Sequence, residues 1–170
     1  MKIREATIDD IPSLSKLAQQ TYIKTFGHTM DKKELKLALK SRSESYFKSI
    51  IHQDTILVAC ENNSLVGFIQ FGKVDYESIK TTNRDIKLDK IYVASNYQGK
   101  GIGKKLVETM LKHKRLSGIE NIYVDVFMKN QKALSLYEKY GFKTIGQVPF
   151  KLDKKIIGYD ILMKKIGTQF

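Results

Sequence analysis

The sequence predicts an α/β fold in a single domain that spans residues 1–170. Segments with strand periodicity alternate with amphipathic helical segments in the order β-α-α-β-β-β-α-β-α-β-β. Near the middle of the chain, a glycine-rich turn that carries lysines joins an apolar strand to a helix. With 170 residues and 42% hydrophobic content, the chain is long enough for one well-filled core and too short for two typical domains.

The first third of the chain predicts one short strand and two helical regions. Residues 2–6 have strand character, and the segment from Thr7 to Asp10 resembles a capping box that opens the first helix. A second helical region is expected over 31–51, with an interruption near 41–45. The predicted buried residues are Ile11, Leu14, Leu17, Ala18 and Tyr22 in the first region, and Leu35, Leu39, Tyr46, Phe47 and Ile50 in the second.

Strands dominate the rest of the chain. Residues 55–61 and 64–73 are rich in β-branched and aromatic residues and flank the turn dipeptide Asn62-Asn63, which predicts a β-hairpin. A polar loop over 75–84 follows. The remaining predicted elements are a strand over 86–93, a helix over 101–116, a strand over 121–127, a helix between Asn130 and Gly141, and antiparallel strands over 143–148 and 156–163.

The charge balance bears on the partners of the protein. Thirty lysine and arginine residues against 18 acidic ones give a net charge of +12, which could attract nucleic acid, an anionic membrane or an acidic protein. Because the lysines are spread along the whole chain, we expect solvated faces rather than a nucleic-acid surface. No zinc-finger spacing is present in the sequence, and we expect no metal.

The sequence also bears on the compartment. No apolar run approaches the roughly 20 residues of a membrane helix, and the N-terminus lacks the apolar core of a secretory signal. The chain has one cysteine, Cys60, which cannot form an internal disulfide. We therefore expect a cytoplasmic protein with no membrane partner.

The turn over residues 98–104 is suited to hold a phosphate. Glycines let the backbone turn sharply and approach a ligand without Cβ clashes, and the first N–H groups of the following helix point at whatever anion lies there. Lys100, Lys104 and Lys105 add positive charge at the same helix end. The spacing fits neither a nucleotide P-loop nor a dinucleotide fingerprint. An ordinary glycine-rich turn is the alternative.

A second motif follows about thirty residues later, at the predicted helix over 130–142. Asn130 predicts the N-cap and Gly141 the C-cap, and Tyr137 belongs to the apolar face between them. The residues that define the motif are Asn130, Ala133, Tyr137, Gly141 and Phe142.

Together, the Gln98-x-x-Gly101-x-Gly103 turn and this second motif resemble the signatures of the GNAT superfamily of CoA-dependent N-acetyltransferases. The resemblance covers residues 88–142 and implies a mixed, strongly twisted, mostly antiparallel sheet with helices on both faces and a splayed central strand pair. It also implies acetyl-CoA as co-substrate. By resemblance, the cofactor-binding residues are Ile91, Tyr92, Val93, Gln98, Gly99, Lys100, Gly101, Ile102, Gly103, Lys104, Asn130, Lys132 and Tyr137.

The resemblance also suggests catalytic residues. The family places a tyrosine at the position of Tyr137, with its hydroxyl near the CoA sulfur, and a phenol of pKa near ~10 can protonate a thiolate whose conjugate acid is near ~8.5. Without the motif, Tyr137 would be read as an ordinary core residue of the helix. Asp89, on the predicted strand, is the candidate general base, either directly or through water, or it attracts a cationic substrate. Many family members carry a Glu at that position or two residues earlier, where this chain has Lys87.

The acceptor amine is less well defined by the sequence. Softer matches resemble bacterial spermidine/spermine N-acetyltransferases of the PaiA type, which implies a small-molecule polyamine acceptor. A net charge of +12 would repel a polycation unless a local acidic pocket forms, for which the candidates are Asp31, Glu34, Glu44, Asp75, Glu77 and Asp89. The alternatives are acetylation of a protein N-terminus or another small amine, and a non-catalytic acyl-CoA sensor. Dimers are common in the family, so a homodimer is a further expectation.

Overall fold

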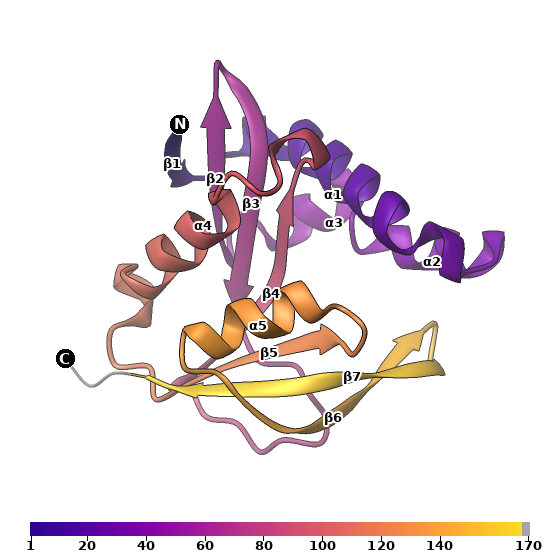
Figure 1. Cartoon of the computed structure of the whole chain (residues 1–170), viewed down its shortest axis with the longest axis vertical. Helices are drawn as coiled ribbons and strands as arrows, with labels where there is room; N and C mark the ends of the chain where they lie inside the picture. The colour runs from indigo at the N-terminus through magenta and orange to yellow at the C-terminus, as the bar shows by residue number, and fades with distance from the viewer. Residues whose placement is uncertain (168–170) are drawn as a thin grey trace. The chain divides into compact units, whose positions relative to one another are not determined.

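The computed structural model describes residues 1–167 and confirms the predicted α/β class. Figure 1 shows the elements. The helices are α1 (Ile11–Phe26), α2 (Lys32–Lys40), α3 (Glu44–Ile50), α4 (Ile102–Leu111) and α5 (Gln131–Lys139). The strands are β1 (Lys2–Glu5), β2 (Thr55–Glu61), β3 (Ser64–Gly72), β4 (Asp85–Val93), β5 (Asn121–Phe127), β6 (Lys143–Leu152) and β7 (Lys155–Ile166).

The seven strands follow the hydrogen-bonded order β1-β2-β3-β4-β5-β7-β6. The pairs β1–β2, β5–β7 and β6–β7 are antiparallel, whereas β4 and β5 are parallel, so the sheet is mixed and mostly antiparallel as expected. The chain divides into two compact units. The first comprises Met1–Gln70 and Lys90–Leu111, and the second comprises Phe71–Asp89 and the residues from Lys112 onward. Strand β4 contributes to both.

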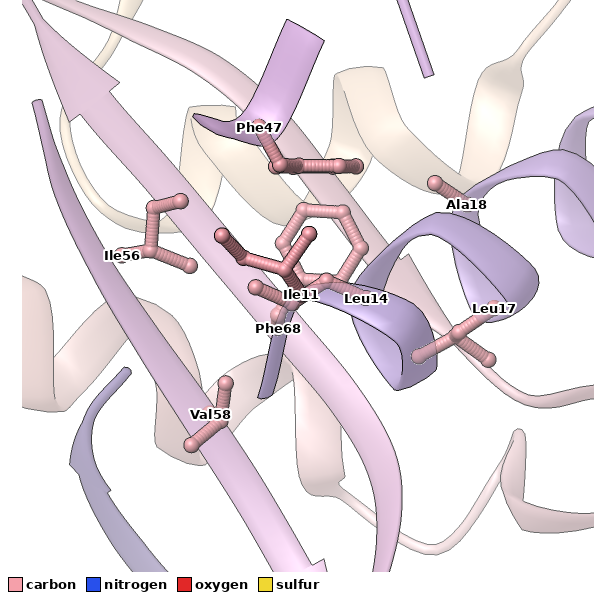
Figure 2. Close-up of a cluster of buried hydrophobic side chains, with 8 residues drawn as sticks. All are labelled: Ile11, Leu14, Leu17, Ala18, Phe47, Ile56, Val58 and Phe68. Atoms are coloured by element: carbon pink, nitrogen blue, oxygen red, sulfur yellow. The ribbon is translucent and has the colours of Figure 1, made fainter. Parts of the chain in front are cut away.

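The first unit has helices on both faces of its strands. Figure 2 shows one face, where α1, α3, β2 and β3 contribute a core of Ile11, Leu14, Leu17, Ala18, Phe47, Ile56, Val58 and Phe68. On the other face, a Cβ added at Gly67 of β3 would lie 3.3 Å from Ile102 and 3.4 Å from Leu106 of α4. The spacing that predicted α1 is therefore confirmed, since its residues at helical intervals are the buried ones.

The second unit is built on β5, β7 and β6, with the first residues of β4. The parallel β4–β5 ladder pairs only Asp85 to Leu88 with Asn121 to Val124, although both strands continue beyond it. Side chains alternate in direction along these strands. One face carries Tyr123 and Leu162, which pack with Val74 from the loop before β4. A Cβ at Gly141, just after α5, would lie 3.2 Å from the Lys165 Nζ atom, which places this end of α5 near β7.

The helix predicted over 101–116 is shorter than expected. It ends at Leu111, and a 3-10 turn over Lys114–Leu116 follows. The helical backbone is broken at His113, which is extended (φ −73°, ψ 140°). Its Nδ1 atom accepts a hydrogen bond from Arg115 N at 3.2 Å, and its ring packs edge-on against Phe71. The contact of His113 with Phe71, 42 positions earlier in the sequence, therefore outweighs the local helical pattern.

The closing hairpin is longer than predicted. Strands β6 and β7 meet at a turn in which Asp153 (φ 48°) and Lys154 (φ 69°) are left-handed, as are Asn62 and Asn63 of the first hairpin. The Asp-Lys pair lacks the Asn or Gly that usually marks such a turn. Pro149 is accommodated because β6 lies at the edge of the sheet.

Candidate functional site

The glycine-rich turn connects β4 to α4 in the first unit. Gly99 (φ 78°) and Gly101 (φ 77°) both have left-handed backbones that only glycine adopts without strain, and a Cβ at either would meet nothing within 4 Å. The first bond of α4 runs from Lys105 N to Gly101 O at 3.0 Å. The N–H groups of the preceding residues therefore have no acceptor within the helix. The glycines here are required by backbone conformation.

The turn is tied back to the end of β4. The Gln98 side chain donates from Nε2 to Val93 O at 3.0 Å, and Tyr97 N donates to Ala94 O at 2.8 Å. Gln98, which the resemblance assigns to the cofactor, thus stabilises the turn through its side-chain amide. Lys100 lies with its Nζ atom 4.8 Å from the Tyr97 ring centroid, and Lys104 lies 3.9 Å from Glu108. Both lysines are exposed.

The end of β4 presents two different faces. The side chains of Ile91 and Val93 each lie 3.9 Å from a Cβ built at Gly103, next to the start of α4. Tyr92 points the other way, where its ring packs edge-on against Phe68 and its hydroxyl accepts a bond from Arg42 Nε at 3.0 Å. Tyr92 is therefore part of the packing around α1 and α3 through its side chain.

Helix α5 carries the second motif in the second unit. The N-cap prediction is confirmed, because the Asn130 Oδ1 atom accepts a hydrogen bond from Ala133 N at 3.2 Å. Gly141 is left-handed (φ 84°), as expected of a C-cap. Tyr137 is buried at 3% exposure and packs against Phe142, with ring centroids 5.4 Å apart. Lys132 is exposed on the outer side of the helix.

A charge cluster on β4 and β5 of the second unit has a buried ammonium at its centre. This ammonium belongs to Lys87, whose Nζ atom lies 2.9 Å from Asp75 and 3.3 Å from both Asp89 and Asp125. The Tyr76 ring centroid is 4.4 Å from the same nitrogen. Burial opposes the charge on Lys87, but the surrounding carboxylates, with Asp125 foremost, raise its pKa. Lys87 therefore stays protonated.

The cluster extends to Tyr76 and to Asp160 of β7. The Tyr76 hydroxyl donates to the Asp125 carboxylate, and burial together with this carboxylate raises the pKa of the phenol. Asp160 is hydrogen-bonded to Asp125, and burial followed by the charge of Asp125 raises the pKa of Asp160 to about 6. Three carboxylates thus pair with the Lys87 ammonium, and a fourth carboxyl, Asp160, adjoins Asp125.

The structure places the predicted site residues in two groups. The turn over 98–104 and the segment 91–93 belong to the first unit, whereas Asp89, Asn130, Lys132 and Tyr137 belong to the second. Of the candidates for an acidic pocket, Asp75 and Asp89 come together, and both pair with the Lys87 ammonium. The other candidates are engaged elsewhere: Asp31 and Glu34 form the capping box of α2, Glu44 pairs with Lys48, and Glu77 pairs with Lys151.

Sequence reasoning missed Tyr76, Asp125 and Asp160. A usable signal existed for Asp125, since a charged residue inside the apolar strand Asn121–Phe127 needs a buried partner. Within residues 1–167, no group of three or more His, Cys, Asp and Glu side chains is arranged to hold a metal ion. No helix in that range has the length and apolar character to cross a membrane.

Comparisons with known proteins bear on the family and the fold of the chain. Residues 11–142 match the model of the acetyltransferase (GNAT) family, which is well over half of the chain. The spermine/spermidine N(1)-acetyltransferase of Bacillus subtilis is 32% identical over 94 residues, which cover 55% of this chain and 62% of that protein. The chain thus aligns with less than two thirds of the length of this relative.

Solved structures show the same fold over nearly the whole chain. The PaiA N-acetyltransferase from Thermoplasma acidophilum, solved with coenzyme A, superimposes with a TM-score of 0.77 over 97% of this chain and 98% of its own, at 22% identity. A ribosomal-protein-alanine N-acetyltransferase from Brucella melitensis gives a TM-score of 0.73 over 98% and 99%, at 23% identity. With the family model and the matching fold, the chain belongs to the acetyltransferase (GNAT) family.

Proposed function

We propose that this protein transfers an acetyl group directly from acetyl-CoA to a primary amine of a small molecule. The observation that carries the proposal is the turn between β4 and α4, where two left-handed glycines precede a ten-residue helix with unbonded N–H groups in its first turn. Such a helix end suits the pyrophosphate of CoA. The exposed Lys100 and Lys104 add positive charge there.

In this proposal, the chain's residues divide the work of acetyl transfer. The amine nitrogen forms a bond to the thioester carbonyl carbon, the C–S bond breaks, and a proton must leave the nitrogen while another reaches the sulfur. Backbone groups of the segment 91–93 would bond the thioester and the pantetheine arm. Asp89, ion-paired with Lys87, is the proposed acceptor of the amine proton, and Tyr137 is the proposed donor to the thiolate.

A polyamine is the proposed acceptor. The Bacillus subtilis relative is named for spermine and spermidine, and the Thermoplasma structure is named PaiA. The cluster around Lys87 supports a cationic acceptor, because its carboxyl groups outnumber its ammonium despite the net charge of +12. The single cysteine, Cys60, is consistent with a reaction in the cytoplasm.

The experiment is a thiol-release assay with acetyl-CoA and a panel of spermidine, spermine, monoamines, amino acids and N-terminal peptides. Turnover with spermidine or spermine supports the full proposal. Turnover only with a peptide keeps the acetyl transfer and replaces the acceptor, as the likeness to the Brucella protein would suggest. Binding of CoA with no turnover on any amine would contradict the proposed enzyme and favour an acyl-CoA sensor.

A matched pair of variants tests the turn itself. Gly101 and Gly118 have nearly the same backbone (φ 77° and 78°), and a Cβ at either meets nothing within 4 Å. Alanine should therefore strain both sites alike, by about 1–2 kcal/mol. We expect Gly101→Ala to weaken acetyl-CoA binding in calorimetry and Gly118→Ala to leave it unchanged. If the two variants bind acetyl-CoA with equal affinity, the turn is not part of the cofactor site.

A further inference from the structure

Lys87 lies where the parallel ladder between β4 and β5 ends. The last paired residues are Leu88 and Val124, so Asp89 and Asp125 are the first residue of each strand beyond the ladder. The Lys87 ammonium bonds both of them, at 3.3 Å each. One side chain thus links the two strands at the position where their backbone pairing stops.

The buried Lys87 ammonium has an unfavourable desolvation free energy, so stability alone does not explain why a lysine occupies this position. The Lys87 residue is 8% exposed, so its carboxylate partners must offset the lost hydration of its ammonium. Apolar residues of similar size often replace buried ion pairs with no loss of stability. The third carboxylate, Asp75 at 2.9 Å, belongs to an exposed side chain, and the Tyr76 ring lies 4.4 Å from the cation. These contacts hold the Lys87 ammonium in one position between Asp89 of β4 and Asp125 of β5.

We propose that Lys87 is a positioning residue that fixes where β4 and β5 separate and that holds the Asp89 carboxylate in one orientation. The proposal rests on the proposed function, because its consequence for turnover requires Asp89 to take part in acetyl transfer. Asp89 lies on β4 two residues before the segment 91–93, whose backbone groups are the proposed ligands of the thioester. The carboxylate that Lys87 holds is the proposed acceptor of the amine proton.

Several charged and titratable groups face Lys87 or the carboxylates that it holds. They are Asp75 and Tyr76 from the loop before β4, Asp89 from β4, Asp125 from β5 and Asp160 from β7. The charge on Lys87 lowers the pKa of Asp160, against the stronger effects of burial and Asp125. Removal of this charge should therefore move the titration of Asp160 upward from about 6.

The first test compares Lys87→Met with Lys151→Met. Lys151 also pairs with an acidic side chain, Glu77 at 3.2 Å, but both are exposed. With acetyl-CoA and the acceptor found in the thiol-release assay, we expect Lys87→Met to lose about 10- to 100-fold in kcat, as small misplacements of reacting groups do. Lys151→Met should keep kcat. A folded Lys87→Met with unchanged kcat and an unchanged pH–rate profile would overturn the proposal.

A double-mutant cycle separates positioning from a general loss of stability. If Lys87 acts through Asp89, Lys87→Met should lower kcat in the wild-type background and have little further effect in Asp89→Asn. Equal losses in both backgrounds would contradict this coupling. If Lys87→Met does not fold, Lys87→Arg keeps the charge with a different geometry. We then expect a reduced kcat with the Asp160 titration near its wild-type position, and full activity of Lys87→Arg would count against a fixed orientation.

Amide hydrogen exchange tests whether Lys87 links β4 and β5, and this experiment needs no amine substrate. Lys87→Met, or Lys87→Arg if Met does not fold, should speed exchange at Asp89 and Asp125 more than at the ladder residues Leu88 and Val124. Lys151→Met should leave all four unchanged. Uniform exchange changes across β4 and β5 would overturn the proposed link. A wild-type protein that acetylates no amine would refute the proposed function while this exchange pattern still tested the role of Lys87 in the sheet.

Discussion

The Asp160 carboxyl has a pH dependence that a titration of stability can reveal. Burial and Asp125 raise its folded-state pKa from 3.8 to about 6, so between these values the folded chain holds more protons at this site than the unfolded chain. Stability contributed by Asp160 therefore falls as pH rises through this window. Since the side chain is partly exposed, we expect a loss of about 1–2 kcal/mol after allowance for solvent screening.

Asp160→Asn should remove this loss, because a neutral amide can still donate to Asp125. The variant should gain about 1–2 kcal/mol over wild type between about pH 4 and pH 7, measured by urea unfolding. Glu138→Gln is the control, since Glu138 is exposed on α5. Parallel pH profiles for wild type and Asp160→Asn would show that Asp160 titrates at the same pH in the folded and unfolded chains.

Tyr137 offers a prediction at the same scale that concerns catalysis. Tyr137→Phe should lower kcat at least tenfold and leave acetyl-CoA affinity nearly unchanged, as expected when a proton donor used only in the transition state is lost. Tyr140→Phe removes a hydroxyl from the residue that caps the same helix and is the control. A Tyr137→Phe variant that retains wild-type kcat would make Tyr137 a structural residue, packed against Phe142, and not the proton donor.

Single residues differ in how far sequence identifies them. Asn130 and Gly141 act within one helix, so local rules predict their roles, and the structure confirms Asn130 as the N-cap and places the left-handed Gly141 directly after the C-cap residue, Tyr140. Lys87 is visible in the sequence only as a charge near the proposed base. Its partners are Asp75 from a loop, Asp89 from the same strand and Asp125, 38 residues later, from β5. No local sequence pattern predicts that these side chains come together.

At the scale of elements, Gly67 of β3 shows how closely α4 approaches the sheet. A Cβ added there would lie 3.0 Å from Tyr92 O, in addition to its short distances to Ile102 and Leu106. We expect Gly67→Val to destabilise the fold by about 1–3 kcal/mol, because either α4 or the end of β4 must move. Thermal or urea unfolding measures this loss.

A glycine in an open part of the sheet provides the comparison for Gly67. A Cβ added at Gly158 of β7 would meet nothing within 4 Å, so Gly158→Ala should cost little. If Gly67→Val proves no more destabilising than Gly158→Ala, α4 is not held tightly against β3. Acetyl-CoA affinity should fall with Gly67→Val as well, because α4 provides the proposed phosphate-binding end.

Whole elements were more predictable than their ends. Alternation and helical spacing predicted the seven strands and four helical regions, since each buries an apolar face within its own segment, and the structure divides the second of these regions into α2 and α3. The ends that differ have non-local causes. His113 stops α4 by packing against Phe71, and the edge position of β6 lets Pro149 lie inside a strand where it would otherwise end one. The parallel ladder between β4 and β5 pairs only four residues of each strand, and no pattern within either strand predicted where it ends.

At the scale of the whole molecule, the net charge of +12 should assist the capture of the anionic cofactor. Between about 0.1 M and about 1 M NaCl the Debye length falls from about 10 Å to about 3 Å, so long-range attraction is screened out. We expect the association rate of acetyl-CoA, measured by stopped flow, to fall several-fold over this range. If the dissociation rate changes much less, salt acts mainly on the diffusional encounter between acetyl-CoA and the protein.

Two variants of equal charge separate local from overall electrostatics. Lys104→Gln removes a charge beside the turn, and Lys151→Gln removes one from β6 in the second unit. If charge at the turn guides the cofactor, Lys104→Gln should slow association more than Lys151→Gln at low salt, and the difference should vanish at high salt. Equal rates for the two variants at low salt would mean that the overall charge alone attracts acetyl-CoA, and that Lys104 serves only as one of many solvated lysines.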